Sequence, residues 1–207
     1  MRTVAADRGG DLDVDLSMEA IASSRAEGRQ PHLDELVARD WGRPDLALCL
    51  LVDASGSMSG DRLAAAALTA AACTWRAPAE FAVLSFARQV RVHRPVLGRA
   101  GPETVVNELL GLRGHGMTAV AAALRAGAEQ LEAARARRRV TVLLSDCRAT
   151  DGEDPVPPAL AQAELVVIAP ADDSAEAESL AATAGARIAT IATADEAPRA
   201  LAKLLDG

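Results

Sequence analysis

Aromatic side chains and lysine are nearly absent from this sequence of 207 residues. It holds two Phe, two Trp, no Tyr and a single lysine, Lys203. Because half of the residues are hydrophobic, we expect a sizeable core packed from Ala, Val, Leu and Ile. A phosphate-binding loop of the Gly-x-x-x-x-Gly-Lys type needs a lysine in a glycine-rich turn, whereas Lys203 lies in an apolar-periodic helix near the C-terminus. The chain is therefore not itself a P-loop ATPase.

Cysteines and long hydrophobic runs are also scarce. The three cysteines, Cys49, Cys73 and Cys147, are far apart and show no zinc-ligand spacing, which suits a reducing cytosol. The longest apolar run, 46–52, has the length of a strand and not the roughly 20 residues of a membrane-spanning helix. The first fifteen residues are acidic and lack the apolar segment of a signal peptide. We predict a cytoplasmic protein.

Positive charge is in deficit as well. The chain has 22 Lys and Arg residues against 29 Asp and Glu residues, a net charge of −7. Binding to a phosphate backbone needs a basic face, so nucleic acid is not expected as a partner. The surplus of negative charge favours solubility and repels anionic membrane surfaces. Neither nucleic acid nor membrane is therefore predicted to be a partner.

Strand-length apolar runs alternate with Ala-rich helical runs from about Asp45 onward. This alternation is the signature of βαβ units around a buried parallel sheet. Val90–His93 follows the preceding run too closely for a crossover helix, so we interpret it as an antiparallel edge strand. We predict an α/β fold with three layers, a doubly wound, mostly parallel six-stranded sheet and one antiparallel edge strand, of the Rossmann-like kind. The other strands are expected at 47–52, 81–86, 140–144, 165–169 and 187–191, and the helices at 61–75, 102–110, 118–138, 175–184 and 196–205.

The expected helix 118–138 carries a cluster of arginines at its end. Apolar residues recur along one of its faces at helical spacing. Arg135, Arg137 and Arg138 would fall in the last turn, where positive charge suits the negative end of the helix dipole. The cluster also offers a contact to an acidic ATPase surface, but helix capping explains it well enough.

The first forty residues follow a different pattern. Asp and apolar residues alternate from Asp11 to Leu16, which indicates a strand. Met18–Ala26 indicates a helix, and Ser23–Pro31 indicates a loop. We predict that residues 1–40 form an N-terminal arm packed on the main domain, which spans residues 41–207.

Three loops with polar side chains are expected at the carboxyl ends of the predicted strands. The first is Asp53-Ala54-Ser55-Gly56-Ser57, directly after the first buried strand. The second is Gly114–Thr118, directly before the long helix, and the third is Ser145-Asp146, at the end of the next strand. Ligand sites in open parallel sheets form at this edge. The sequence therefore predicts one site built from all three loops.

The side chains of these loops offer only oxygen to a cation. Two carboxylates neutralise a dication, and neutral hydroxyls leave its Lewis acidity for one further ligand, water or a carboxylate from another molecule. Hard oxygen ligands select Mg²⁺, and also Mn²⁺ or Ca²⁺, over Zn²⁺ or Cu²⁺. The predicted metal ligands are Asp53, Ser55, Ser57, Thr118 and Asp146.

Asp-x-Ser-x-Ser after a hydrophobic strand, then Thr, then Asp after another strand, resembles the metal-ion-dependent adhesion site (MIDAS) of von Willebrand factor A (VWA) domains. The resemblance covers about residues 45–207. It implies that Ser55, Ser57 and Thr118 contact the metal directly and that Asp53 and Asp146 bind it directly or through water. From the residue alone, Thr118 is as well explained as a helix N-cap, and it can be both.

The closer likeness is to bacterial proteins. The segments Leu12–Ala22 and Val52–Met58 resemble the C-terminal part of the magnesium chelatase D subunit and the VWA proteins paired with MoxR-type AAA+ ATPases. Such families imply a cytosolic, non-enzymatic chain that docks on an AAA+ ring and links it to a target, with an Asp or Glu of the partner completing the metal site. The sequence departs from the pattern at Ala119, where many integrin-type domains have Asp. It departs again at Cys147, where Gly is usual and where an added side chain is expected to narrow the third loop.

Two other interpretations of the same residues stay open. A metal-dependent phosphohydrolase with Asp53 as nucleophile would need a carboxylate at position 55 and a nearby lysine, and the chain has neither. In the second interpretation the metal is purely structural and holds the loops in place, which needs only the same ligands. His115 is interpreted as an exposed loop residue, and His32 and His93 have no partners at ligand spacing.

Overall fold

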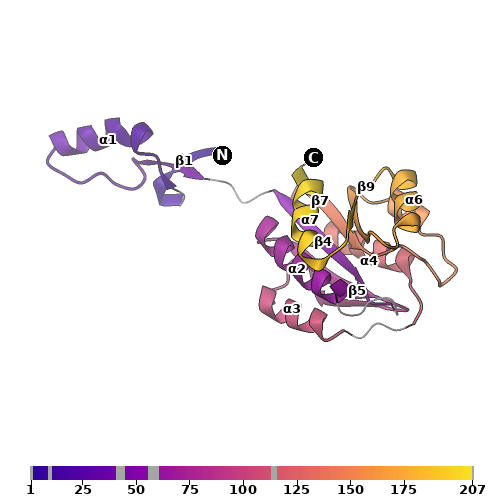
Figure 1. Ribbon diagram of the computed structural model, residues 1–207. Helices are drawn as coiled ribbons and strands as arrows, with labels where there is room; N and C mark the ends of the chain where they lie inside the picture. Colours follow the sequence, from indigo (N-terminus) through magenta and orange to yellow (C-terminus); the bar gives the residue numbers. More distant parts are fainter. Residues whose placement is uncertain (1, 9–10, 41–44, 56–60, 113–115, 207) are drawn as a thin grey trace. The chain divides into compact units, whose positions relative to one another are not determined.

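The computed structural model describes residues 2–8, 11–40, 45–55, 61–112 and 116–206. Contacts within the chain divide it into two compact units, Met1–Pro44 and Asp45–Gly207, and each is described by itself (Figure 1). That the first forty residues pack on the main domain stays a prediction. Among the described residues, no helix is long and apolar enough to cross a membrane.

The larger unit is built on a six-stranded sheet in the order β6-β5-β4-β7-β8-β9. All neighbouring strands are parallel except β6, which runs antiparallel to β5 at the edge. This confirms the predicted fold class and the edge strand. The strands are β4 (Leu46–Asp53), β5 (Phe81–Phe86), β6 (Val90–Arg94), β7 (Arg138–Leu144), β8 (Leu165–Pro170) and β9 (Arg187–Ile191).

Helices cover both faces of this sheet, which gives the three layers (Figure 1). On one face α2, α3 and α7 pack against alternate residues of the strands, and on the other face α4, α5 and α6 pack against the rest. Every residue of β4 is buried, as its uninterrupted apolar run predicts. The helices are α2 (Asp61–Arg76), α3 (Pro102–Leu110), α4 (Val120–Glu132), α5 (Val156–Leu160), α6 (Ala175–Ala184) and α7 (Ala197–Asp206), with a short 3-10 turn, η2, at Ala194–Glu196.

Small side chains allow the layers to approach closely. A Cβ on Gly127 of α4 would lie 3.2 Å from a methyl carbon of Leu51, so α4 rests directly on β4 at this point. Cys49 and Cys73 are buried in the two faces of the core, and burial raises the pKa of the Cys73 thiol to about 12. These two cysteines are core residues, as their apolar neighbours indicate.

The predicted helix 118–138 is too long. The helix α4 ends at Glu132, so Arg135 and Arg137 lie in the connection that follows and Arg138 begins β7. The Glu80 carboxylate accepts hydrogen bonds from the Arg135 and Ala136 amides at 2.8 and 2.9 Å, which fixes the connection as a turn. The proposed interaction of the arginines with the α4 dipole is therefore wrong.

The smaller unit contains an antiparallel sheet in the order β1-β3-β2 and one helix. The alternating segment 11–16 is a strand only at its first two residues. Asp13 is the helix N-cap instead, and its carboxylate accepts a hydrogen bond from the Leu16 amide at 3.2 Å. The N-cap hydrogen bond of Asp13 thus starts a helix where the alternating pattern predicts a strand, and α1 begins four residues earlier than predicted. The elements are β1 (Arg2–Ala5), η1 (Ala6–Arg8), β2 (Asp11–Leu12), α1 (Val14–Ala26) and β3 (Val37–Asp40).

Candidate functional site

The candidate metal site begins at the last residue of β4. Asp53 is only 1% exposed. One of its carboxylate oxygens accepts a hydrogen bond from the Ser55 amide at 2.8 Å, and the other accepts one from the Ser145 hydroxyl at 2.6 Å. The Ser55 hydroxyl also hydrogen-bonds to Asp53. Asp53 therefore ties the first loop to the third, as expected for neighbouring strands that end at one edge.

The second loop is held at the same edge by backbone hydrogen bonds. The Ala119 amide donates to the Ala87 carbonyl at 2.9 Å, and the Ala54 amide donates to the Phe86 carbonyl at 2.7 Å, so the end of β5 supports the first and second loops together. Thr118 is buried, and its amide donates to the Thr150 hydroxyl at 2.8 Å. The N-cap of α4 is Ala119. The Thr118 hydroxyl therefore does not cap the helix, and the capping interpretation of this residue is wrong.

The third loop contains the one described residue other than glycine with a positive φ. Cys147 has φ 62°, a left-handed conformation that glycine adopts without strain. Its amide donates to the Ser145 hydroxyl at 2.9 Å, while the Asp146 carboxylate accepts from the Arg148 amide at 3.0 Å. The Cys147 side chain is buried with the core on the α4 face of the sheet. Its thiol also lies 3.8 Å from the Ser145 carbonyl of the same loop, and the expected narrowing of this loop stays a prediction.

Two buried carboxylates give this site its electrostatic character. Burial raises the pKa of Asp53, and the negative charge of Asp146 raises it further, while hydrogen bonds from Ser145 and Ser55 oppose the shift. Asp146 is itself 6% exposed. A dication would offset the cost of holding both carboxylates ionised in this place. The residues present therefore fit a metal ion.

The composition of the site distinguishes among metals. Among the described residues, no three His, Cys, Asp or Glu side chains gather into a metal-binding group. A metal would thus rely on two carboxylates and on hydroxyls, a donor set for hard cations. The structure brings Asp53, Ser55, Thr118 and Asp146 to one edge of the sheet, whereas Ser57, Gly56 and His115 lie outside the described residues.

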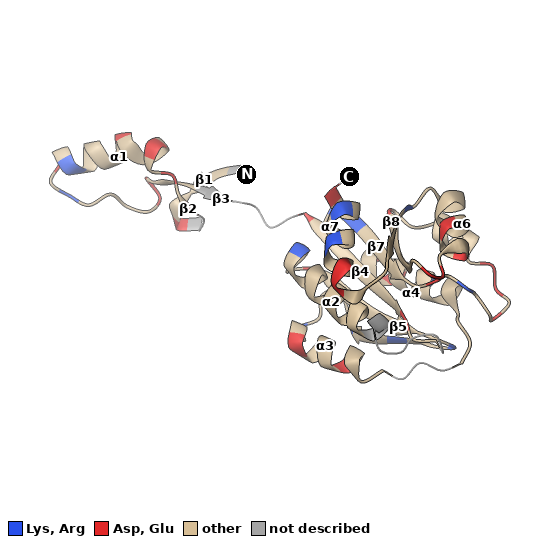
Figure 2. Cartoon of the chain, in the orientation of Figure 1, with Lys and Arg blue, Asp and Glu red and all other residues tan. Residues whose placement is uncertain are grey.

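Acidic residues beyond the third loop are partly engaged elsewhere. Glu153 pairs with Arg125 of α4 through two contacts of 2.7 and 2.8 Å. Arg148 reaches Asp173 at 2.5 Å, just before α6, where acidic residues gather (Figure 2). These ion pairs brace the rim of the site and are exposed, so each adds little stability.

His93 has partners that sequence reasoning missed. Its Nε2 lies 2.7 Å from the Ser85 hydroxyl, and its Nδ1 lies 2.7 Å from the Glu108 carboxylate. Ser85 is only 4% exposed and the His93 side chain is fully buried, so no substrate reaches this serine. The array fastens α3 to the β5–β6 pair. A single serine in the otherwise apolar run of β5 was the available signal.

Comparisons with known proteins agree with this architecture. A protein-family model described as VWA domain containing CoxE-like protein matches residues 1–203, which span both units. A search of the curated proteins found no match.

Similar solved structures cover most of the larger unit. A von Willebrand factor type A protein from Catenulispora acidiphila is 18% identical with a TM-score of 0.60, and the match covers 76% of this chain and 41% of that one. The manganese-loaded Plasmodium vivax TRAP protein is 17% identical with a TM-score of 0.61, covering 75% and 71%. An aerotolerance-related membrane protein from Bacteroides fragilis NCTC 9343 is 14% identical with a TM-score of 0.62, covering 78% and 98%. At these identities the likeness shows the fold.

Proposed function

The chain belongs to the family of VWA domain containing CoxE-like proteins, and from that premise we propose that it is a divalent-metal-dependent protein-interaction module. The observation that carries the proposal is the pair of buried carboxylates, Asp53 and Asp146, at the loop-bearing edge of the sheet. Interaction modules of this fold need no catalytic group, and we propose that this chain is not an enzyme.

The metal we propose is Mg²⁺, with Mn²⁺ or Ca²⁺ as substitutes. Ser55, Ser57 and Thr118 would supply hydroxyl oxygens, and Asp53 and Asp146 would supply the charge. The Ser55 hydroxyl can donate to Asp53 and still offer a lone pair to the ion. When bound, the metal would act as a Lewis acid that accepts one more oxygen ligand. The manganese-loaded state of the similar Plasmodium vivax protein supports a divalent ion.

The partner we propose is a AAA+ ATPase of the chelatase or MoxR type, or its substrate protein, in the cytoplasm. An Asp or Glu of that partner would complete the metal coordination, and the surrounding loops would select it. The resemblance of the segments Leu12–Ala22 and Val52–Met58 to VWA proteins paired with such ATPases supports this assignment.

Calorimetric titration with Mg²⁺ tests the metal half of the proposal. We expect saturable binding by the wild type and none by Asp53→Ala. Asp151→Asn is a matched control, because Asp151 lies close to the third loop but is not among the proposed ligands. Equal binding by wild type and Asp53→Ala would overturn the proposal.

Capture from a lysate of the source organism tests the partner half. We expect a AAA+ ATPase or its substrate to be retained in Mg²⁺ and released by EDTA. If EDTA does not release the partner, the result would favour the alternative in which the metal only holds the loops in place. A screen with generic phosphate esters tests the phosphohydrolase alternative, and we expect no turnover, because Ser55 stands where such an enzyme needs a second carboxylate and Lys203 is the only lysine of the sequence.

A further inference from the structure

A second feature lies at the opposite edge of the sheet, that is, at the end of the parallel strands where β5 begins. There a pocket of about 550 Å³ opens between the end of α2, the start of β5 and the start of α3. We call it the Arg94 groove. The side chains that matter for the argument are Trp75, Pro78, Phe81, Arg94, Arg99 and Pro102.

The base of the groove holds a buried positive charge. Arg94 is 5% exposed, and its guanidinium stacks over the Phe81 ring at 3.6 Å from the centroid. It donates to the backbone carbonyls of Ala100 at 3.0 Å and Gly98 at 2.6 Å, and also to that of Phe81. Among the described residues, no carboxylate pairs with it. The guanidinium also donates to the Pro95 carbonyl at 3.4 Å, and burial lowers the pKa of Arg94.

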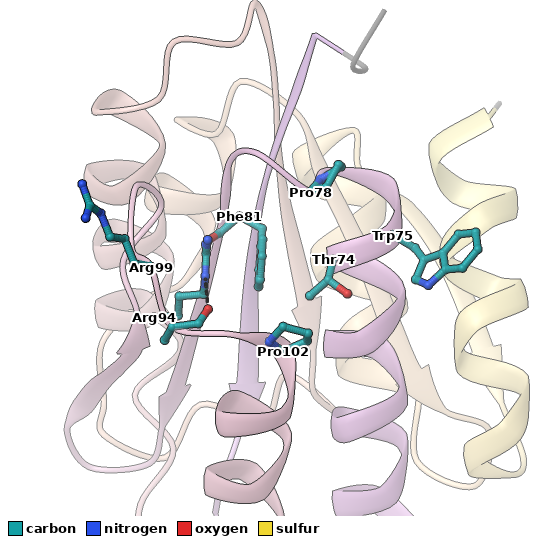
Figure 3. A pocket seen from close by; sticks show the side chains of 8 residues that line it. Thr74, Trp75, Pro78, Phe81, Arg94, Arg99 and Pro102 are labelled. Atoms are coloured by element: carbon teal, nitrogen blue, oxygen red, sulfur yellow. Dashed lines mark hydrogen bonds between the residues drawn. The ribbon is translucent and has the colours of Figure 1, made fainter. Parts of the chain in front are cut away.

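The rim adds a second cation and an exposed aromatic ring. Figure 3 shows Arg99 and Trp75 on opposite sides, with Phe81, Arg94 and Pro102 between them. Trp75 is 89% exposed, although exposed tryptophan is uncommon away from interaction surfaces. Arg99 is exposed and forms no ion pair with a described residue. None of the described residues that line the groove is acidic.

Charge complementarity identifies the occupant. The chain carries a net charge of −7, yet this groove presents two arginines beside apolar walls. A carboxylate next to an apolar side chain would meet both kinds of surface at once. Tryptophan and arginine are also the residues that dominate binding energy at protein interfaces.

We propose that the Arg94 groove binds an acidic, apolar peptide segment of a partner protein. The carboxylate of the segment faces Arg94 and Arg99, and its apolar side chain packs against Phe81, Pro78 and Pro102, with Trp75 on the rim. The groove is separate from the metal site, because Phe81 begins β5 whereas Asp53 pairs with the last residue of that strand. The chain then has two docking points, one at each edge of the sheet.

Tryptophan fluorescence tests this proposal. The chain has two tryptophans, so a Trp41→Phe background leaves Trp75 as the only reporter. The probe is the capped peptide Gly-Asp-Leu-Glu-Leu-Asp-Gly, titrated in EDTA so that the metal site cannot contribute. We expect a saturable shift of Trp75 emission to shorter wavelength. The matched peptide with Asn and Gln in place of the acids is expected to give none.

Charge reversal at the rim separates specific docking from general attraction. Arg99→Glu is expected to weaken peptide binding about tenfold or more. Arg91→Glu is the matched control, since Arg91 is exposed on β6, does not line the groove and carries the same charge. Absence of a saturable shift, or equal weakening by both substitutions, overturns the proposal. An equal shift with inorganic phosphate alone also overturns it and assigns a small-anion site instead.

Discussion

Buried side chains of opposite charge lie at the two ends of the parallel strands, which are two opposite edges of the central sheet. At the edge where β4 and β7 end, Asp53 and Asp146 gather, and the pKa of Asp53 is raised by burial. At the opposite edge, Arg138 hydrogen-bonds to Glu164 and holds the pKa of that carboxyl below its usual range. A buried cation, Arg94, lies there as well and donates to backbone carbonyls. We propose that the first edge binds a cation and that the groove at the second edge binds an anionic group.

The largest expected effect is a double dissociation between these edges. Asp53→Ala should abolish Mg²⁺ binding and leave the affinity for the acidic peptide unchanged. Arg99→Glu should do the reverse, because the two sites lie at opposite ends of β5. Parallel calorimetric and fluorescence titrations of both variants measure this. If either substitution reduced both affinities, the two edges would not be independent sites.

The second effect concerns the stability that Arg94 provides. Replacing it in Arg94→Met should lower the free energy of unfolding by about 3 kcal/mol, since buried carbonyls lose their donor and the contact with Phe81 changes. Arg99→Met should change it by less than about 0.5 kcal/mol, because Arg99 is exposed. Urea denaturation measures both. Equal effects would show that Arg94 is not an organising residue of this edge.

Much of this comparison was predictable from the sequence. The alternation of apolar runs predicted the succession of strands and helices along the chain. The position of Asp53 after a fully apolar run predicted its place at the end of a strand. Parallel strands then bring Asp146 to the same edge. Thr118 is held there by the hydrogen bond from the Ala119 amide to the Ala87 carbonyl. The sequence therefore predicted that Asp53, Ser55 and Asp146 lie at one edge of the sheet, whereas their role as metal ligands stays a prediction.

The Arg94 groove and the His93 array were not predictable in the same way. Arg94 meets the carbonyls of four separate residues, and no spacing in the sequence encodes carbonyl partners. His93 meets Glu108 only because α3 packs beside β6. The error over helix 118–138 has the same origin, because Glu80 fixes the turn at Arg135 from 55 residues away. Local periodicity carries no information on such long-range partners.

The third effect is a difference in pH dependence between the edges. The raised pKa of Asp53 means that, without metal, stability falls as pH rises above the ordinary aspartate value of 3.8, because the unfolded chain ionises first. The lowered pKa of Glu164 means that stability is complete above its ordinary value of 4.5 and is lost as pH falls below it. Asp53→Asn should remove the first trend and Glu164→Gln the second.

Urea unfolding in EDTA between about pH 3.5 and 7 measures these trends. Adding Mg²⁺ should cancel the loss in the wild type at the upper end of the range and have no effect on Asp53→Asn. A wild type and an Asp53→Asn variant with the same slope above pH 4 would contradict the assignment of the trend to this carboxyl.

The smallest effect tests the backbone of the third loop. Alanine normally stabilises a protein relative to glycine by reducing the entropy of the unfolded chain. At position 147 the left-handed conformation, φ 62°, penalises any side chain by about 1–2 kcal/mol. Cys147→Gly and Cys147→Ala both remove the buried thiol, so their difference isolates the backbone term. We expect the glycine variant to be more stable by about 0.5–1 kcal/mol in urea denaturation. If the alanine variant were the more stable, the loop that carries Asp146 would not be strained, and the preference for glycine at this step in related domains would need another cause.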